Sequence, residues 1–150
     1  SVWKPDCFFF RQIYDFPRLV LNRAAATSTD TIHRMRCNGS TAAFAPSIYT
    51  HLTAASAEIE GRSYGGGVLE LEPTEAERLL VPAALGHGLA IEECDRLIRD
   101  GRLDEVLEEN DRLILAGVLG LSKRECSMLR TIWEKMRNRR MARKRRTRGE

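Results

Sequence analysis

Apolar positions in the first third of the chain fall in short runs that predict strands. Residues 7–10, 19–22 and 31–37 are rich in aromatic or β-branched side chains and are separated by turn-forming residues. In the third run neither alternating face is wholly apolar, which predicts a strand at the edge or surface of a sheet. Apolar and polar residues also alternate at 68–72, which predicts a fourth, half-buried strand.

Helical spacing begins between the third and fourth predicted strands. Apolar residues recur every three or four positions from Phe44 to Ile59, which predicts a single helix of about five turns. The polar pair at 40–41 can cap this helix, and Pro46 is tolerated because it lies near the start. Gly61 then ends the helix.

The rest of the chain has helical patterning. A capping box formed by Thr74 and Glu77 predicts a short helix that ends near residue 80. Further helices are predicted at 91–100, which Gly101 ends, and from residue 103 to the glycines near 117.

A last amphipathic helix is predicted to begin at a second capping box, formed by Ser122 and Glu125. Its apolar stripe ends at Met136, and we expect the following basic turns to project from the body. The order of elements predicts the α+β class, with a small sheet of short strands, packed helices and a helical C-terminal segment. We divide the chain into a unit at 1–85 and a helical segment at 86–150.

Charge is distributed unevenly along the chain, whose net charge is +3. Residues 1–122 contain 12 basic and 18 acidic side chains, a balance of −6, whereas residues 123–150 contain 12 and 3, a balance of +9. A segment so basic on an otherwise acidic chain indicates a polyanionic partner such as nucleic acid, or a solvated tail.

Cysteine usage and hydropathy exclude several classes of protein. The four cysteines lie far apart and form no CxxC pair, which indicates separate reduced thiols rather than a disulfide or a metal site. No apolar run reaches the roughly 18 residues of a bilayer span, and the first residues lack the pattern of a signal peptide. We therefore predict a cytoplasmic protein with no membrane partner. The cysteines are Cys7, Cys37, Cys94 and Cys126.

The sequence shows no constellation typical of an enzyme active site. A cofactor cradle of the α/β kind needs a glycine turn that follows a strand and opens onto a helix. Residues 65–67 instead follow a predicted helix, and 86–88 have no convincing strand before them. The histidines His33, His51 and His87 show no paired spacing with carboxylates or cysteines, and we expect His51 to be partly solvated.

Two segments carry residue types suited to nucleic acid. The first, called here the basic run, spans residues 135–148 and contains nine basic side chains. Guanidinium groups match phosphate oxygens, so this run predicts contacts with a DNA backbone, the alternative being a solubilising tail. The predicted contacts are Arg137, Arg139, Arg140, Arg143, Lys144, Arg145 and Arg146, with Lys135 and Arg148 completing the nine.

The second segment, residues 62–67, is called here the glycine loop. Arg62 can fork onto guanine, Tyr64 can stack on a displaced base, and the glycine backbone lets a phosphate approach closely. The alternative is an ordinary turn with the tyrosine packed beneath it. We predict DNA contacts from Arg62, Ser63, Tyr64, Gly65 and Gly66, and further contacts from Arg34 and Arg36 unless these two are salt-bridged surface residues.

These segments resemble the C-terminal part of bacterial and phage-type adenine-specific DNA methyltransferases. The similarity is carried by residues 27–34 (TSTDTIHR), 56–73 (SAEIEGRSYGGGVLELEP), 74–82 (TEAERLLVP) and the arginine-rich helical end at 115–148. Residues 61–82 are its most specific portion. The resemblance implies a target-recognition domain that grips duplex DNA, reads a short sequence and helps to present a flipped adenine.

The same resemblance implies S-adenosylmethionine as the cofactor of the complete enzyme and a catalytic methyltransferase domain as a partner of this one. The family's cofactor-binding glycine motif and its catalytic Asn/Asp-Pro-Pro-Tyr/Phe motif are both missing, since all five prolines stand alone. We therefore expect no cofactor in this chain and no methylation by it alone. Two alternatives remain: a specificity subunit of a multi-subunit restriction–modification system, and a protein-interaction module whose helices at 90–136 dock a partner.

Overall fold

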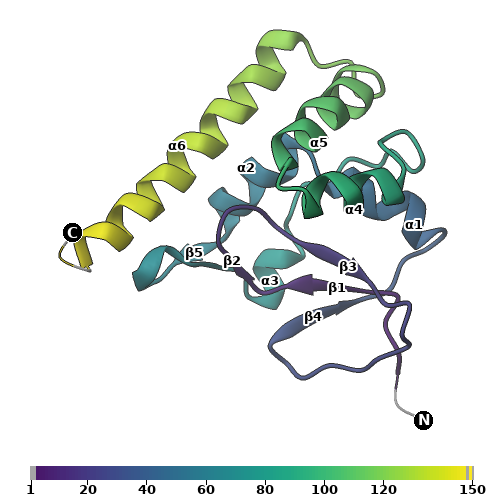
Figure 1. The fold of residues 1–150 in the computed structure, drawn as a ribbon, viewed down its shortest axis with the longest axis horizontal. Coiled ribbons are helices and arrows are strands. Elements are labelled where there is room, and N and C mark those ends of the chain that lie inside the picture. The colour runs from purple at the N-terminus through teal and green to yellow at the C-terminus, as the bar shows by residue number, and fades with distance from the viewer. Residues whose placement is uncertain (1–2, 148, 150) are drawn as a thin grey trace.

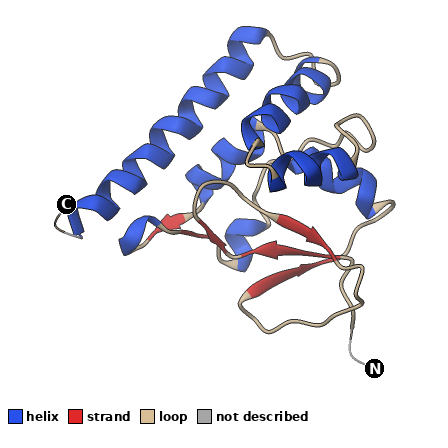
Figure 2. Cartoon of the chain, viewed as in Figure 1, coloured by secondary structure: helices blue, strands red, loops and turns tan. Residues whose placement is uncertain are grey.

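Short strands form two small antiparallel sheets in the computed structural model, which describes residues 3–147 and 149 (Figure 2). In the first sheet, β1 (Cys7–Phe10) lies between β3 (Leu19–Leu21) and β4 (Ile32–Met35). In the second, β6 (Leu69–Glu70) lies between β2 (Gln12–Ile13) and β5 (Arg62–Ser63). The edge position predicted for the third strand is confirmed, because β4 pairs only with β1 among the described strands.

The single helix predicted from Phe44 to Ile59 is wrong. The structure has α1 (Thr41–Phe44), a 3-10 turn η1 (Ala45–Ile48) and α2 (His51–Glu60). Proline lies at the second position of η1 and lacks an N–H, and Tyr49 leaves the helical region at φ −84° and ψ 65°. Thr50 then caps α2 by accepting the N–H of Thr53. The new helix has its own register, so Ile59 is 63% exposed instead of buried.

The N-cap of the next helix lies two residues earlier than predicted. In α3 (Pro73–Ala76) the capping residue is Glu72, whose side chain accepts the N–H of Glu75, while the carboxylate of Glu75 accepts the N–H of Glu72 at 2.8 Å. The predicted box of Thr74 and Glu77 is therefore wrong, although a helix does follow Pro73.

Helices make up most of the second half of the chain. They are α4 (Ile91–Arg99), α5 (Leu103–Asn110), a wide π-type segment η3 (Asp111–Ala116) and α6 (Lys123–Thr147). The predicted capping box of α6 is confirmed, since Ser122 and Glu125 exchange backbone-to-side-chain hydrogen bonds of 3.1 Å in both directions. With its two small sheets and these helices, the molecule has the predicted α+β class.

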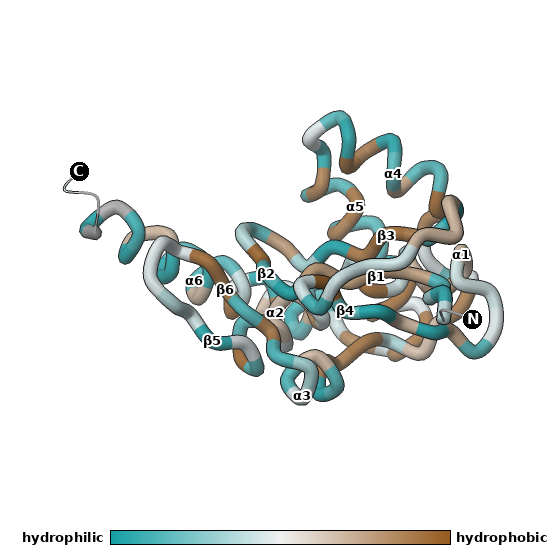
Figure 3. The backbone as a smooth tube through the Cα atoms, turned by 90° about the horizontal axis from the view of Figure 1, so that it is seen from below, coloured by the Kyte–Doolittle hydropathy of each residue, from teal (hydrophilic) through white to brown (hydrophobic). Residues whose placement is uncertain are grey.

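The main hydrophobic core is shared by the strands, α2 and the later helices. Phe16, Leu69, Leu107 and Trp133 are all buried in one cluster, so it contains residues from both sides of position 85. The edge of the Trp133 ring meets Phe16 with 5.9 Å between ring centroids. Figure 1 shows α6 running along the outside of this body, and Figure 3 shows mostly hydrophilic residues on its C-terminal turns. Among residues 3–147, no helix has the length and hydropathy of a membrane span.

Candidate nucleic-acid interface

The glycine loop contains β5 and the 3-10 turn η2 (Gly65–Gly67), and it leads into β6. The side chains of residues 62–64 are exposed to solvent. Gly66 and Gly67 have φ values of +85° and +78°, a backbone conformation that side chains larger than hydrogen disfavour. Tyr64 is 52% exposed, and Ser63, Gly65 and Gly66 are exposed as well. The tyrosine ring is therefore not packed beneath the turn.

Arg62 is held at the base of this loop by an acidic partner. Its Nε lies 2.8 Å from Oε1 of Glu75, a carboxylate that is only 7% exposed and also caps α3. The pKa of Arg62 is raised first by Glu75 and then by a hydrogen bond with Tyr64. The Nε side of the Arg62 guanidinium is therefore held by Glu75, while the side chain as a whole remains 69% exposed to solvent.

The C-terminal half of α6 packs against the glycine loop. A Cβ placed on Gly67 would lie 3.1 Å from Cβ of Lys144 and 3.4 Å from Sδ of Met141. A shallow hollow of about 170 Å³ between loop and helix is lined by Ser63, Arg139 and Arg143, among others. The expectation that the basic turns project from the body is therefore wrong for the face of α6 that meets the loop.

The basic run presents different residues on different faces of α6. Lys135, Arg139, Arg143 and Arg146 are exposed and recur every three or four residues, so they lie along one side of the helix. Arg137 is half-buried instead, with its guanidinium 4.3 Å from the centre of the Trp133 ring and hydrogen bonds to Asn138. The side chain of Arg145 and the whole of Arg148 lie outside the described residues.

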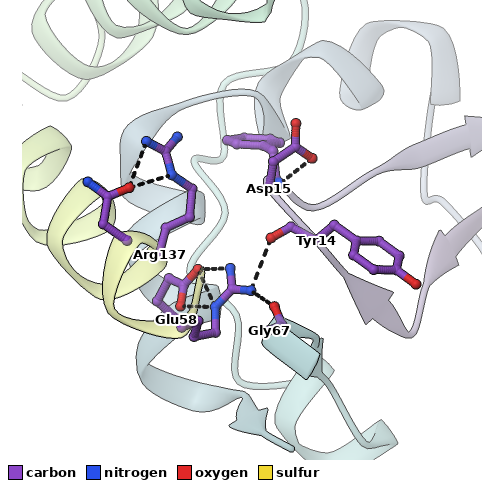
Figure 4. A network of polar contacts seen from close by, with 8 residues as sticks. Tyr14, Asp15, Glu58, Gly67 and Arg137 are labelled. Atoms are coloured by element: carbon purple, nitrogen blue, oxygen red, sulfur yellow. Dashed lines mark hydrogen bonds and ion pairs between the residues drawn. The ribbon is translucent and has the colours of Figure 1, made fainter. Parts of the chain in front are cut away.

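Arg140 occupies an interior position. It is 4% exposed, and its guanidinium pairs with both carboxylate oxygens of Glu58 and donates to the backbone carbonyls of Tyr14 and Gly67 (Figure 4). Nothing in the sequence distinguishes this arginine from its neighbours, because its partners lie far away along the chain. Arg140 is therefore not part of the surface that the basic run exposes, and the DNA contact predicted for it stays a prediction.

Arg34 is part of β4 and Arg36 directly follows it. Figure 1 shows β4 well away from the C-terminal half of α6. The guanidinium carbons of Arg34 and Arg36 lie 5.6 and 5.2 Å from the centre of the Trp3 ring, and Arg34 also reaches Asp30 at 3.9 Å. Both side chains are exposed. The structure therefore brings together the glycine loop and the basic run, and leaves this arginine pair as a separate patch.

Sequence reasoning missed a buried histidine–aspartate pair. Nδ1 of His51 lies 2.6 Å from Oδ2 of Asp111, and the backbone N–H of His51 donates to the same carboxylate at 3.0 Å. His51 is 3% exposed, so the expectation of a partly solvated side chain is wrong. The neighbouring Asn110 is fully buried and bonds the carbonyls of Pro46 and Tyr49. These contacts join the junction of α5 and η3 to η1 and to the start of α2.

Possible metal-ligating groups and the setting of the glycine loop bear on what else this surface could hold. Within the described part of the chain no group of three or more His, Cys, Asp or Glu side chains is placed to hold a metal. The glycine loop leads into strand β6, whereas phosphate groups of cofactors commonly bind at a glycine turn that leads into a helix. The four cysteines are free thiols, and burial raises the pKa of Cys7 and of Cys94 to about 11.

Comparison with known proteins identifies the family. No curated protein and no solved structure matches this chain. Residues 1–115 match the family model described as the C-terminal domain of the Type II methyltransferase M.Eco57I. The matched range contains both sheets, the glycine loop and α5, and it stops before α6. Because the match covers more than half of the chain, this protein belongs to the family of Type II methyltransferase C-terminal domains.

Proposed function

We propose that this chain binds duplex DNA and recognises a short target sequence on behalf of an adenine-N6 methyltransferase of a restriction–modification system. The observation that carries the proposal is the packing of the glycine loop against the basic run. This packing brings the loop that carries the exposed Tyr64 beside Arg139 and Arg143, which line a hollow together with Ser63, although the two segments are far apart in the sequence.

Each part of this surface suits a different component of DNA. The exposed stripe of α6 offers Lys135, Arg139, Arg143 and Arg146 to phosphates, a contact that gives affinity but carries no sequence information. The glycine loop offers Tyr64 for stacking and Arg62 for a base edge. Arg34 and Arg36 form a second basic patch that can bind the flanking duplex.

Charge along α6 supports a polyanionic partner. After Glu134 the next acidic residue is Glu150, so the basic run contains no carboxylate of its own. Lys135, Arg139 and Arg143 have no acid three or four positions away in the sequence, whereas Arg146 has Glu150 at that spacing. We infer that a phosphate backbone matches the positive charge of this run.

The complete reaction is assigned to a larger enzyme. On the resemblance to adenine-specific methyltransferases, S-adenosylmethionine and the methyl transfer belong to a catalytic domain that acts with this one, and a flipped adenine is the substrate base. The proposal places the protein in the cytoplasm, where bacterial DNA lies. Mass spectrometry of DNA treated with the full-length enzyme tests the base, since N6-methyladenine is the expected product.

DNA recognition is tested with the 150-residue chain and a pool of labelled duplexes whose central segment is randomised. We expect binding whose log K falls linearly with log salt, and enrichment of a subset of sequences on repeated selection. Tight binding with no enrichment would contradict target recognition, and an absence of binding at low salt would contradict the whole proposal.

A protein-interaction module is the alternative that a specific observation favours. Four apolar side chains are exposed near the junction of η3 with α6, namely Val118, Leu119, Met128 and Ile132. The same duplex titration separates the two functions, because an interaction module that uses its arginines only for solubility gives no enrichment of any sequence.

A further inference from the structure

One buried guanidinium joins three distant segments of the molecule. Nε of Arg140 lies 3.1 and 2.9 Å from the two carboxylate oxygens of Glu58 on α2, and Nη2 also donates to Glu58. Nη1 donates to the carbonyl of Tyr14 at 3.0 Å and to that of Gly67 at 2.6 Å. Figure 4 shows both carbonyls directed at this guanidinium, while the ring of Tyr14 points away.

The ion pair is almost completely buried beside the hollow that both of its residues help to line, and its partners lie far apart along the chain. The side chains of Arg140 and Glu58 are 5% and 3% exposed. Arg140 is separated from Glu58 by 82 residues, from Gly67 by 73 and from Tyr14 by 126. Only a guanidinium has enough donors in a planar fork to serve a carboxylate and two carbonyls together. A lysine ammonium lacks this geometry.

The glycine loop has few other supports at its tip. Cβ atoms built on Gly65 and Gly66 would meet nothing within 4 Å, so this part of the turn is open to solvent. At Gly67 the loop touches α6 through Met141 and Lys144, and its carbonyl accepts from Arg140. The pairing of β5 with β6 and the ion pair of Arg62 with Glu75 hold the base of the loop on the sheet. The contacts of Gly67 are the ones that join the loop to α6, so they fix the place of Tyr64 relative to the arginines of that helix.

We propose that Arg140 is a positioning residue for DNA recognition: through Glu58 and the carbonyls of Tyr14 and Gly67, it holds the glycine loop in register with the exposed arginines of α6. The inference rests on the proposed DNA-binding function and adds that Arg140 itself does not touch DNA. Arg139 and Arg143 flank it on α6 and line the hollow beside the loop. Fixing Arg140 therefore also fixes the turns of α6 that carry these two side chains.

The test compares a charge-neutral double variant, Glu58→Gln with Arg140→Gln, with the exposed-site variant Arg139→Gln. The double variant removes one charge of each sign, whereas the control removes one positive charge from the surface. Each 150-residue protein is titrated with the randomised duplex pool over a series of salt concentrations. A positioning role predicts that the double variant keeps the salt slope of the parent chain and loses its sequence enrichment by on the order of tenfold. Arg139→Gln should lower the slope by about 0.9 and keep the enrichment.

A slope lowered by about 0.9 in the double variant would show that Arg140 contacts a phosphate, and would overturn the inference. Unchanged slope and unchanged enrichment would overturn it as well. Hydrogen exchange supplies an independent measurement that needs no DNA: amides at 62–67 should exchange faster in the double variant while those of α4 keep their protection. If the double variant fails to fold, Arg140→Lys replaces it in the same measurements, because it keeps a positive charge beside Glu58 and lacks the planar fork that reaches both carbonyls.

The two proposals fail in different ways. If the parent chain does not bind or enrich any duplex, the proposed function is wrong, whatever the exchange data show. If the parent chain enriches a sequence but loop exchange in the variant equals that of the parent chain, the proposed function stands and the positioning role of Arg140 is wrong.

Discussion

Arginines on α4, at the N-cap of α5 and on η3 are placed very differently from those on the C-terminal half of α6. Arg96 pairs with Glu93 at 2.6 Å and Arg99 with Asp95 at 2.9 Å, one helical turn away in each case. The same spacing pairs Arg102 with Glu105 and Arg112 with Glu109. Each of these four arginines therefore has a carboxylate three or four residues away that balances its charge.

The basic run of α6 contains no acid that could balance it in the same way. Arg130 pairs with Glu134 at 2.9 Å, and no carboxylate follows in the sequence until Glu150. Residues 91–116 hold four arginines and nine acids, a balance of −5, whereas the basic run holds nine basic residues and no acid. Both the number of basic residues and the supply of nearby acids therefore indicate that α6 suits a phosphate backbone better than α4 does.

The largest expected effect separates the buried arginine of α6 from its exposed neighbour. Arg140→Met leaves Glu58 charged and unpaired in the interior, and we expect the free energy of unfolding to fall by about 3–5 kcal/mol. Arg139→Met lies on the exposed face and should change it by less than about 0.5 kcal/mol. Urea denaturation measures the free energy of unfolding of both variants. Equal losses in the two variants would contradict the buried position of Arg140.

A smaller effect sharpens the comparison between the two arginine regions. Replacing Arg139, Arg143 and Arg146 by Gln should reduce the slope of log K against log salt for duplex binding by about 0.9 for each phosphate that the variant no longer neutralises. The matched variant replaces Arg96, Arg99 and Arg102 by Gln and removes the same charge from α4 and the start of α5. We expect it to bind duplexes with the slope of the parent chain. Similar slopes in the two triple variants would show that total charge, not its place, determines binding.

Tyr64→Ala tests the glycine loop without altering the charge of either region. The ring is 52% exposed, so its removal should leave the free energy of unfolding within about 0.5 kcal/mol of the parent value. Affinity for enriched duplexes should fall by about 1–3 kcal/mol, the usual contribution of a stacked base. Tyr64→Phe is the control, because it keeps the ring and removes the hydroxyl. A large loss of stability in Tyr64→Ala would show that the ring belongs to the core.

Features with local causes were predictable from the sequence. The capping box at Ser122 and Glu125 lies within four residues and is present as expected. The edge strand near Arg34 and the turn formed by the glycine loop also follow from residue types close together in the chain. The acidic balance of residues 1–122 and the basic balance of residues 123–150 could be counted directly from the sequence.

Long-range contacts account for what the sequence did not reveal. His51 and Asp111 are 60 residues apart, and Glu58 and Arg140 are 82 apart, so no local spacing signals either pair. The sequence does give one indication of the second pair. Glu58 lies in an alanine-rich stretch of α2 that is buried in the structure, and a buried acid needs a partner. Which of the nine basic residues supplies that partner depends on the packing of α6 against α2.

The smallest expected effect concerns a single exposed pair in the balanced region. Arg99 and Asp95 are 77% and 59% exposed at their side chains, so water screens their attraction. A double-mutant cycle with Arg99→Ala and Asp95→Ala should give a coupling of about 0.3–0.5 kcal/mol that shrinks as salt is added. Duplex affinity should be the same in all four proteins, because the pair lies outside the proposed DNA surface. If Asp95→Ala alone made the chain bind duplexes more tightly, an unpaired Arg99 would be contacting DNA, and the acids of α4 would be suppressing a second DNA-binding face.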